Sequence, residues 1–192
     1  MRQATIERKT REVDVKVELN IDGKGVSRIE TDSKFLDHIL TTLAKHSLFD
    51  LTVKASGDLM HHLTEDVALT LGEALVKALG DKRGIKRFGW AYAPMDDCLA
   101  RSAVDLGGRP YSSLDFKFSR QQIEGLETED VKHFFTSLAH ASKSNMHLAL
   151  LYGENDHHKI EALTKALALA LKEAVAIDPR IVGEIPSAKG EL

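Results

Sequence analysis

Residues 57–66 read GDLMHHLTED, and residues 153–162 read GENDHHKIEA. Both stretches have the form G-[DE]-x-x-H-H-x-x-E, and their histidine pairs are 96 residues apart, half of the 192-residue chain. The same histidine-rich pattern at matched places in the two halves of the chain suggests an internal repeat. A repeat of this length would determine the fold, because each copy must then form the same structural unit.

Further matches flank both motifs in the same order. FLDHILTTLA (35–44) aligns with VKHFFTSLA (131–139). Two other pairs of segments continue the alignment: DLTVKA with NMHLALL, and VELNIDGKG with SAVDLGGRP. Such a collinear series indicates a duplication. We therefore expect a single domain made of two pseudo-symmetric halves, 1–84 and 85–192.

Each half has the pattern of a β-β-β-α-β-α unit. Apolar residues alternate over 13–19, as in a half-buried strand, and recur every three to four positions over 35–43, as in an amphipathic helix. The expected strands are 3–9, 12–21, 26–31, 49–56, 88–95, 98–106, 111–118 and 145–152, and the expected helices are 33–46, 61–79, 128–141 and 157–176. If the halves pack through their helices, the fold is α/β (α+β), with the helices sandwiched between two four-stranded sheets.

The composition excludes several classes of protein. It is 43% hydrophobic and 29% charged, which is ordinary for a soluble globular protein, and the net charge of -3 gives no reason to expect nucleic acid. No apolar run approaches the roughly 18 residues that cross a bilayer. The polar N-terminus does not resemble a signal peptide, and Cys98 is the only cysteine. We therefore expect a cytoplasmic protein without nucleic-acid or membrane partners.

The HHxxE motifs indicate metal binding. His61 and Glu65, like His157 and Glu161, are four residues apart and so share one face of a helix, where they can chelate one ion. The second histidine of each pair points roughly 100° away and is better placed to reach another ion.

The repeat suggests that the halves exchange these second histidines between two sites. One predicted site contains His38, His61, Glu65 and His158, and the other contains His133, His157, Glu161 and His62. Mixed nitrogen and oxygen ligands with open positions favour Mn, Fe, Co, Ni or Zn over Ca. His46, His140 and His147 have no histidine at the matching place in the other half, which favours structural roles for them.

Six motifs, in chain order, carry a resemblance to a known family: FLDHIL, HHLTED, PMDD, GRPY, HHKIEALTKA and PSAKGEL. Together they resemble the imidazoleglycerol-phosphate dehydratase family of histidine biosynthesis, over essentially the whole chain. The resemblance implies a carbon–oxygen lyase (a hydro-lyase) that converts imidazole glycerol phosphate to imidazole acetol phosphate. It also implies two Mn²⁺ ions per active site, with Fe, Co or Zn as alternatives, and a homo-oligomer of 24 subunits with active sites between subunits.

The resemblance also implies roles for individual residues. The eight residues of the two predicted metal sites match the family's ligands. The family's phosphate pocket falls on Arg87, Arg109, Lys165, Ser187 and Lys189. Glu12, His46 and Asp96 match positions near the substrate's diol and ring.

A mechanism follows as a hypothesis from these roles. Glu161 removes a proton from the substrate, and Glu12 or His46 assists the leaving hydroxyl. The reaction would pass through a metal-bound imidazolate and a diazafulvene-type intermediate.

One segment departs from the family pattern. GDLMHHLTED is about three residues shorter than the family's usual GDxxxxDHHTxED, and Met60 stands where an acidic residue is usual. A carboxylate there could orient an imidazole ligand, so the departure leaves the tuning of the first metal site open.

Two other functions remain compatible with the residues alone. A binuclear metallohydrolase acting on phosphate esters would also combine a metal pair with basic side chains, although such sites rely more on bridging aspartates. A metal-storage or metal-sensing shell would bind metal without turnover. Conversion of imidazole glycerol phosphate would distinguish the dehydratase from both.

Overall fold

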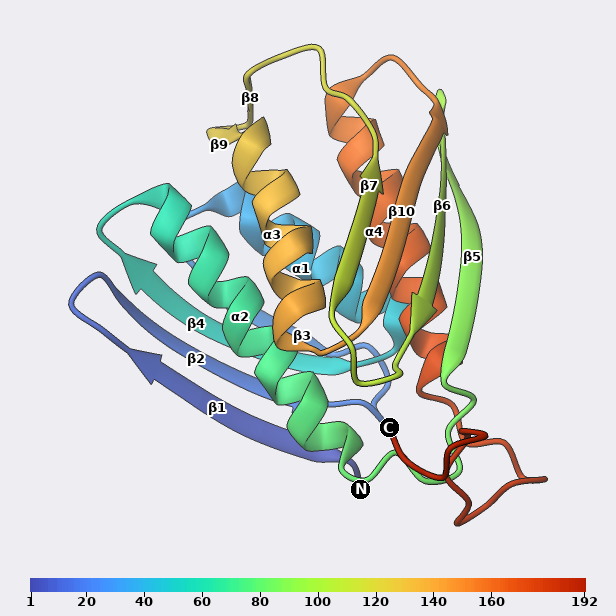
Figure 1. Cartoon of the computed structure of the whole chain (residues 1–192). Coiled ribbons are helices and arrows are strands. Elements are labelled where there is room, and N and C mark those ends of the chain that lie inside the picture. Colours follow the sequence, from blue (N-terminus) through green and yellow to red (C-terminus); the bar gives the residue numbers. More distant parts are fainter.

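The computed structural model describes residues 1–192, which form two four-stranded sheets with the helices between them (Figure 1). The first sheet has the order β1-β2-β4-β3 and the second the order β5-β6-β10-β7. These strands are β1 (Gln3–Lys9), β2 (Val13–Asn20), β3 (Ser27–Glu30), β4 (Asp50–Gly57), β5 (Phe88–Met95), β6 (Cys98–Asp105), β7 (Tyr111–Asp115) and β10 (Asn145–Tyr152). In each sheet only the last strand of that order is parallel to its neighbour.

The four helices are α1 (Lys34–Ser47), α2 (Met60–Leu79), α3 (Thr128–Ala141) and α4 (Asp156–Ala174). The predicted fold class is confirmed, and the predicted elements match those observed to within a few residues at most ends. None of the helices combines the length and the hydropathy needed to cross a bilayer.

Alternating side chains explain why the strands of the first sheet form and which way they face. In β2, Val13, Val15, Val17 and Leu19 are buried, while the residues between them are exposed or half-buried. Successive side chains of a strand point to opposite faces, so this pattern turns one apolar face of the sheet toward the helices. β6 repeats the pattern in the second sheet.

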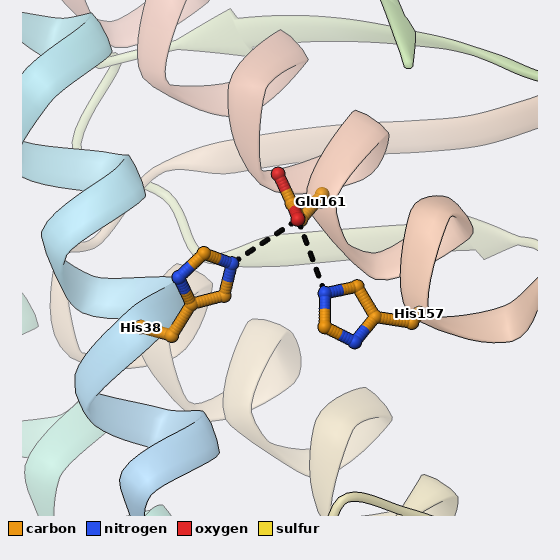
Figure 2. A group of neighbouring side chains, drawn as sticks. All are labelled: His38, His157 and Glu161. Carbon is orange, nitrogen blue, oxygen red and sulfur yellow. Dashed lines mark hydrogen bonds and ion pairs between the residues drawn. The ribbon is translucent and has the colours of Figure 1, made fainter. Parts of the chain in front are cut away.

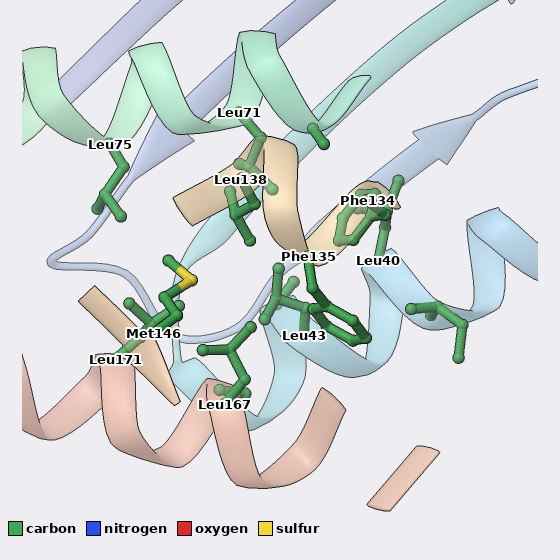
Figure 3. Close-up of a cluster of buried hydrophobic side chains, with 14 of the residues drawn as sticks. Leu40, Leu43, Leu71, Leu75, Phe134, Phe135, Leu138, Met146, Leu167 and Leu171 are labelled. Carbon is green, nitrogen blue, oxygen red and sulfur yellow. The ribbon is translucent and has the colours of Figure 1, made fainter. Parts of the chain in front are cut away.

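The core lies between the sheets and draws on all four helices. Figure 3 shows leucines of α1, α2, α3 and α4 packed around Phe135 of α3 and Met146 of β10. Both of these central side chains are almost completely buried. Full burial of such a side chain contributes about 1.5–3 kcal/mol, so this layer is the main source of stability.

The helices pair across the halves. α2 packs against α3, and α1 packs against α4. At Gly72 of α2 an added Cβ would lie 2.6 Å from the Cβ of Ala141, so glycine permits the close approach of α2 and α3. This pairing determines which histidines meet.

One feature of the second half was not predicted. The predicted strand 111–118 ends at Asp115, and a short hairpin of β8 (Gln122–Ile123) and β9 (Leu126–Glu127) follows before α3. Asp156 accepts hydrogen bonds from the backbone N–H groups of Ser119 and Arg120 and so ties this connection to the start of α4.

Candidate metal centre

The first cluster of candidate ligands lies between α2 and α3 and is called the α2–α3 cluster. It consists of His61, Glu65 and His133, whose ligand atoms all lie within 4.8 Å of one another. Nε2 of His133 is 3.2 Å from Oε1 of Glu65. This nitrogen is buried, and its contact with Glu65 does not have the geometry of a hydrogen bond.

The second cluster, called the α1–α4 cluster, consists of His38 from α1 with His157 and Glu161 from α4. Figure 2 shows both imidazoles pointing at the carboxylate of Glu161. Nε2 of His38 and Nε2 of His157 are each 3.1 Å from Oε1 of Glu161. Both ring nitrogens therefore converge on one carboxylate oxygen.

Both clusters fit a transition-metal ion. Each offers two imidazoles and one carboxylate, a nitrogen and oxygen donor set suited to Mn, Fe, Co or Zn. Three protein ligands leave positions for further ligands or substrate. The buried Nε2 of His133 makes no hydrogen bond, which is explained if a cation accepts its lone pair.

The two clusters differ in their charged neighbours. Oδ1 of Asp130, a buried residue of α3, lies 2.6 Å from Nδ1 of His61. Nζ of Lys165 lies 2.8 Å from Oε2 of Glu161. Burial disfavours the charged form of Glu161, but hydrogen bonds from Lys165 and His38 outweigh burial and lower its pKa to about 2. Glu161 is thus ionised at neutral pH, as a metal ligand must be.

The second histidine of each HH pair lies outside the clusters of its own chain. Nδ1 of His62 is 2.8 Å from Asp58, and this hydrogen bond raises the pKa of His62. Nδ1 of His158 is 2.6 Å from Asp97. The hydrogen bond from His158 lowers the pKa of Asp97, aided by backbone N–H groups at the start of α4. Both imidazoles are thus fixed by a carboxylate.

The predicted grouping of ligands needs correction within a single chain. We expected His38 to join His61 and Glu65, and His133 to join His157 and Glu161. The structure exchanges the two, because α1 packs against α4 and α3 against α2. His158 and His62 join neither cluster of their own chain.

Four of the predicted phosphate ligands line one pocket of roughly 380 Å³: Arg87, Arg109, Ser187 and Lys189. Asp105 holds the guanidinium of Arg87 through contacts of 2.7 and 3.1 Å. The C-terminal segment, residues 187–192, forms part of the pocket wall. Lys165, the fifth predicted ligand, instead contacts Glu161 in the α1–α4 cluster.

The remaining predicted site residues lie close to the histidines. Glu12 was expected on a strand but lies in the turn before β2, with Oε2 3.9 Å from Nδ1 of His62. Asp96 lies in the turn between β5 and β6, 3.5 Å from Nε2 of His158. His46 lies in the last turn of α1, where burial, together with the charge of Lys165, lowers its pKa.

Sequence reasoning missed Asp130, Asp58 and Asp97 as partners of the histidines. Asp58 precedes His62 by four residues, so sequence spacing could have marked it. Asp130 contacts His61 on another helix, and spacing along the chain does not reveal that contact. His147, for which the sequence favoured a structural role, lies near the ring of Tyr111 with 5.8 Å between ring centroids.

Comparisons with known proteins point to one enzyme family. The sequence pattern of the imidazoleglycerol-phosphate dehydratase family matches residues 31–171. An imidazoleglycerol-phosphate dehydratase of Chlorobium phaeovibrioides is 52% identical over 192 residues, covering 98% of this chain and 94% of the relative. An imidazoleglycerol-phosphate dehydratase of Dehalococcoides mccartyi is 50% identical over 191 residues, covering 100% of this chain and 97% of the relative.

Solved structures resemble the whole chain as well. The imidazoleglycerol-phosphate dehydratase of Staphylococcus aureus superposes with a TM-score of 0.85 at 35% identity, covering 92% of this chain and 99% of the other. The Pyrococcus furiosus enzyme, solved in complex with (S)-C348, superposes with a TM-score of 0.85 at 37% identity. The match covers 97% of this chain and 100% of the other.

Proposed function

The chain belongs to the imidazoleglycerol-phosphate dehydratase family, and we propose that its two His/Glu clusters bind the metal ions on which its reaction depends. As a member of this family it is a hydro-lyase of histidine biosynthesis. The observation that carries the proposal is the pair of clusters, each with two imidazoles and one carboxylate within 4.8 Å. We take Mn²⁺ as the metal and Fe, Co or Zn as alternatives, and the cytoplasm as the location of a biosynthetic enzyme.

A second copy of the chain would complete each cluster. His62 and His158 are fixed by carboxylates but lie outside the clusters of their own chain. We propose that a neighbouring subunit's His158 joins the cluster of Glu65, and its His62 joins that of Glu161. Active sites between subunits would require a homo-oligomer, for which we propose the 24 subunits that the resemblance implies.

The phosphate of the substrate would bind in the pocket of Arg87, Arg109, Ser187 and Lys189. Two guanidinium groups and an ammonium group provide the charge-assisted hydrogen bonds that phosphate oxygens accept. Asp105 fixes the direction of Arg87, which limits the entropy lost when phosphate binds.

Metal ions in the two clusters would polarise the imidazole ring of the substrate and make its neighbouring C–H bond more acidic. Glu161 is ionised and can accept the proton from C2, although its ion pair with Lys165 makes it a weak base. His46 or Glu12 would protonate the hydroxyl that leaves C3 as water. The enol that remains then tautomerises to the ketone of the product, imidazole acetol phosphate.

Metal analysis of the purified protein, combined with an assay on imidazole glycerol phosphate, tests the proposal. We expect about two ions per chain, loss of turnover with a chelator, and recovery when Mn²⁺ is restored. Turnover that survives complete removal of metal would refute the proposed metal dependence. Release of phosphate from a generic ester would favour the metallohydrolase alternative.

A further inference from the structure

We propose that the two clusters bind their ions with unequal affinity: the α2–α3 cluster tightly and the α1–α4 cluster weakly. The inference rests on the proposed function, because it concerns the same two ions. It depends on two pairs of positions that are equivalent in the repeat but carry different side chains.

The first pair is Asp130 and Phe35, each three residues before the histidine that α3 or α1 contributes. Asp130 is only 5% exposed, and its Oδ1 is 2.6 Å from Nδ1 of His61. A carboxylate that accepts the Nδ1–H of an imidazole leaves Nε2 free for the metal and makes it a stronger donor. Phe35 instead packs against His157, with 5.1 Å between ring centroids, and can do neither.

The second pair is Lys165 and Leu69, each four residues after the glutamate of its cluster. Nζ of Lys165 is 2.8 Å from Oε2 of Glu161, so it neutralises the only carboxylate among the ligands of that cluster. Its positive charge also repels an incoming cation. Leu69 is uncharged, and the only ion pair of Glu65 is with His133.

The contacts within the clusters also favour tighter metal binding in the α2–α3 cluster. In the α1–α4 cluster, Oε1 of Glu161 already interacts with His38 and His157, so a cation must displace existing contacts. In the α2–α3 cluster, Nε2 of His133 lies 3.2 Å from Oε1 of Glu65, but this contact is not a hydrogen bond, so the buried nitrogen gains a partner when a cation binds. The changes in metal affinity typical of such neighbouring groups are about 10- to 100-fold. We expect a difference of at least this size between the clusters.

Graded removal of metal from the assembled Mn²⁺ protein tests the inference. The protein is dialysed against increasing concentrations of a chelator at constant pH, and manganese per chain is measured by mass spectrometry. We expect two steps of one ion per chain, separated by at least tenfold in free Mn²⁺. Glu65→Gln should remove the tight step, and Glu161→Gln the weak one.

Variants at the unequal positions provide the sharper test. Asp130→Asn should move the tight step about 10- to 100-fold toward weaker binding and leave the other step in place. Lys165→Leu, which installs the residue found in the first half, should move the weak step toward tighter binding. Lys172→Leu, at an exposed lysine two turns further along α4, is the matched control and should move neither step.

Every outcome of the chelation series either supports or overturns the inference of unequal affinity. Two ions lost in a single step, or steps assigned to the opposite clusters, would overturn the inference. The inference would also be overturned if neither Asp130→Asn nor Lys165→Leu changed the chelator concentration at which an ion is lost. If Asp130→Asn does not fold, Lys165→Leu still decides, because that side chain is partly exposed. Absence of bound manganese would refute the proposed function too, whereas two equal sites with metal-dependent turnover would refute this inference alone.

Discussion

The α2–α3 and α1–α4 clusters use the same residue types at equivalent positions, yet their surroundings differ. Asp130 stands beside one cluster where Phe35 stands beside the other, and Lys165 where the first half has Leu69. The duplicated backbone therefore determines where the ligands lie, while single neighbouring side chains determine the charge around them. Equivalent positions of the two halves can also be compared in the strands, in the core and at the second histidines. Paired substitutions at these positions test each comparison.

The largest expected effect is on catalysis. Glu161→Gln should reduce turnover by about 10²–10⁴-fold, because it removes both the proposed base and a metal ligand. Far-UV circular dichroism should show an intact fold. The paired variant Glu65→Gln should act through loss of the other ion, so that excess Mn²⁺ restores part of its activity. Near-normal turnover of Glu161→Gln would remove this residue from the mechanism.

The core should respond in both halves. Leu40 and Phe135 occupy equivalent positions in α1 and α3, and both are almost completely buried. Truncation leaves a cavity, so Leu40→Ala should cost about 2–5 kcal/mol of unfolding free energy and Phe135→Ala about 3–5 kcal/mol. Urea denaturation of each variant measures both values. A cost below 1 kcal/mol at either position would contradict the described packing.

The strands differ in how closely a helix approaches them. Ala4 pairs with Leu19 in the first sheet, as Gly89 pairs with Val104 in the second. A Cβ on Gly89 would lie 2.0 Å from the carbonyl oxygen of Ala170, so Gly89→Ala forces α4 to shift. We expect a cost of about 1–3 kcal/mol in urea denaturation, as for other overpacked sites.

The reverse change, Ala4→Gly, should cost only about 1 kcal/mol, because it introduces no clash. It adds backbone entropy to the unfolded chain and removes one methyl group from the core. Equal costs for the two substitutions would show that the sheets lie equally close to their helices.

The smallest expected effect concerns the carboxylates that hold the second histidines. Asp97 accepts hydrogen bonds from His158 and from the backbone N–H groups of Glu154 and Asn155, whereas Asp58 holds His62. The pKa of Asp97 is lowered, first by His158, so its contribution to stability is present above the ordinary carboxyl pKa of about 4. That contribution is lost as the pH falls through the lower folded-state pKa.

Thermal unfolding between pH 7 and pH 2 follows the loss of this contribution, which begins below about pH 4. Asp97→Asn should lower the melting temperature at pH 7 and reduce its fall on acidification. Asp58→Asn should lower the melting temperature at pH 7 by a smaller amount, because the side chain of Asp58 does not join two segments of the chain. Indistinguishable profiles for the two variants would contradict the assignment.

The repeat made much of the fold predictable. Alternation in segments such as 13–19 and helical spacing in 35–43 occurred in both halves, so each half supported the interpretation of the other. The hairpin at 122–127 was missed because two-residue strands carry no periodicity. The turn at Glu12 was missed because strand ends are set by backbone pairing with a neighbour.

The residues of the two clusters were predicted individually, but their grouping was not. The sequence marks candidate ligands, whereas the residues that each candidate meets depend on which helices pack together. α1 packs against α4, a contact between halves that periodicity within one half cannot reveal. Asp130 was missed for the same reason, since its role depends on α3 lying beside α2.

Anomalous diffraction from crystals grown with saturating Mn²⁺ tests the central claim most directly. Data collected on both sides of the manganese absorption edge would locate the ions. We expect two peaks per chain, one in contact with Nε2 of His133 and the other in contact with Oε1 of Glu161. Peaks confined to other parts of the molecule, or no peak in either cluster, would contradict the account.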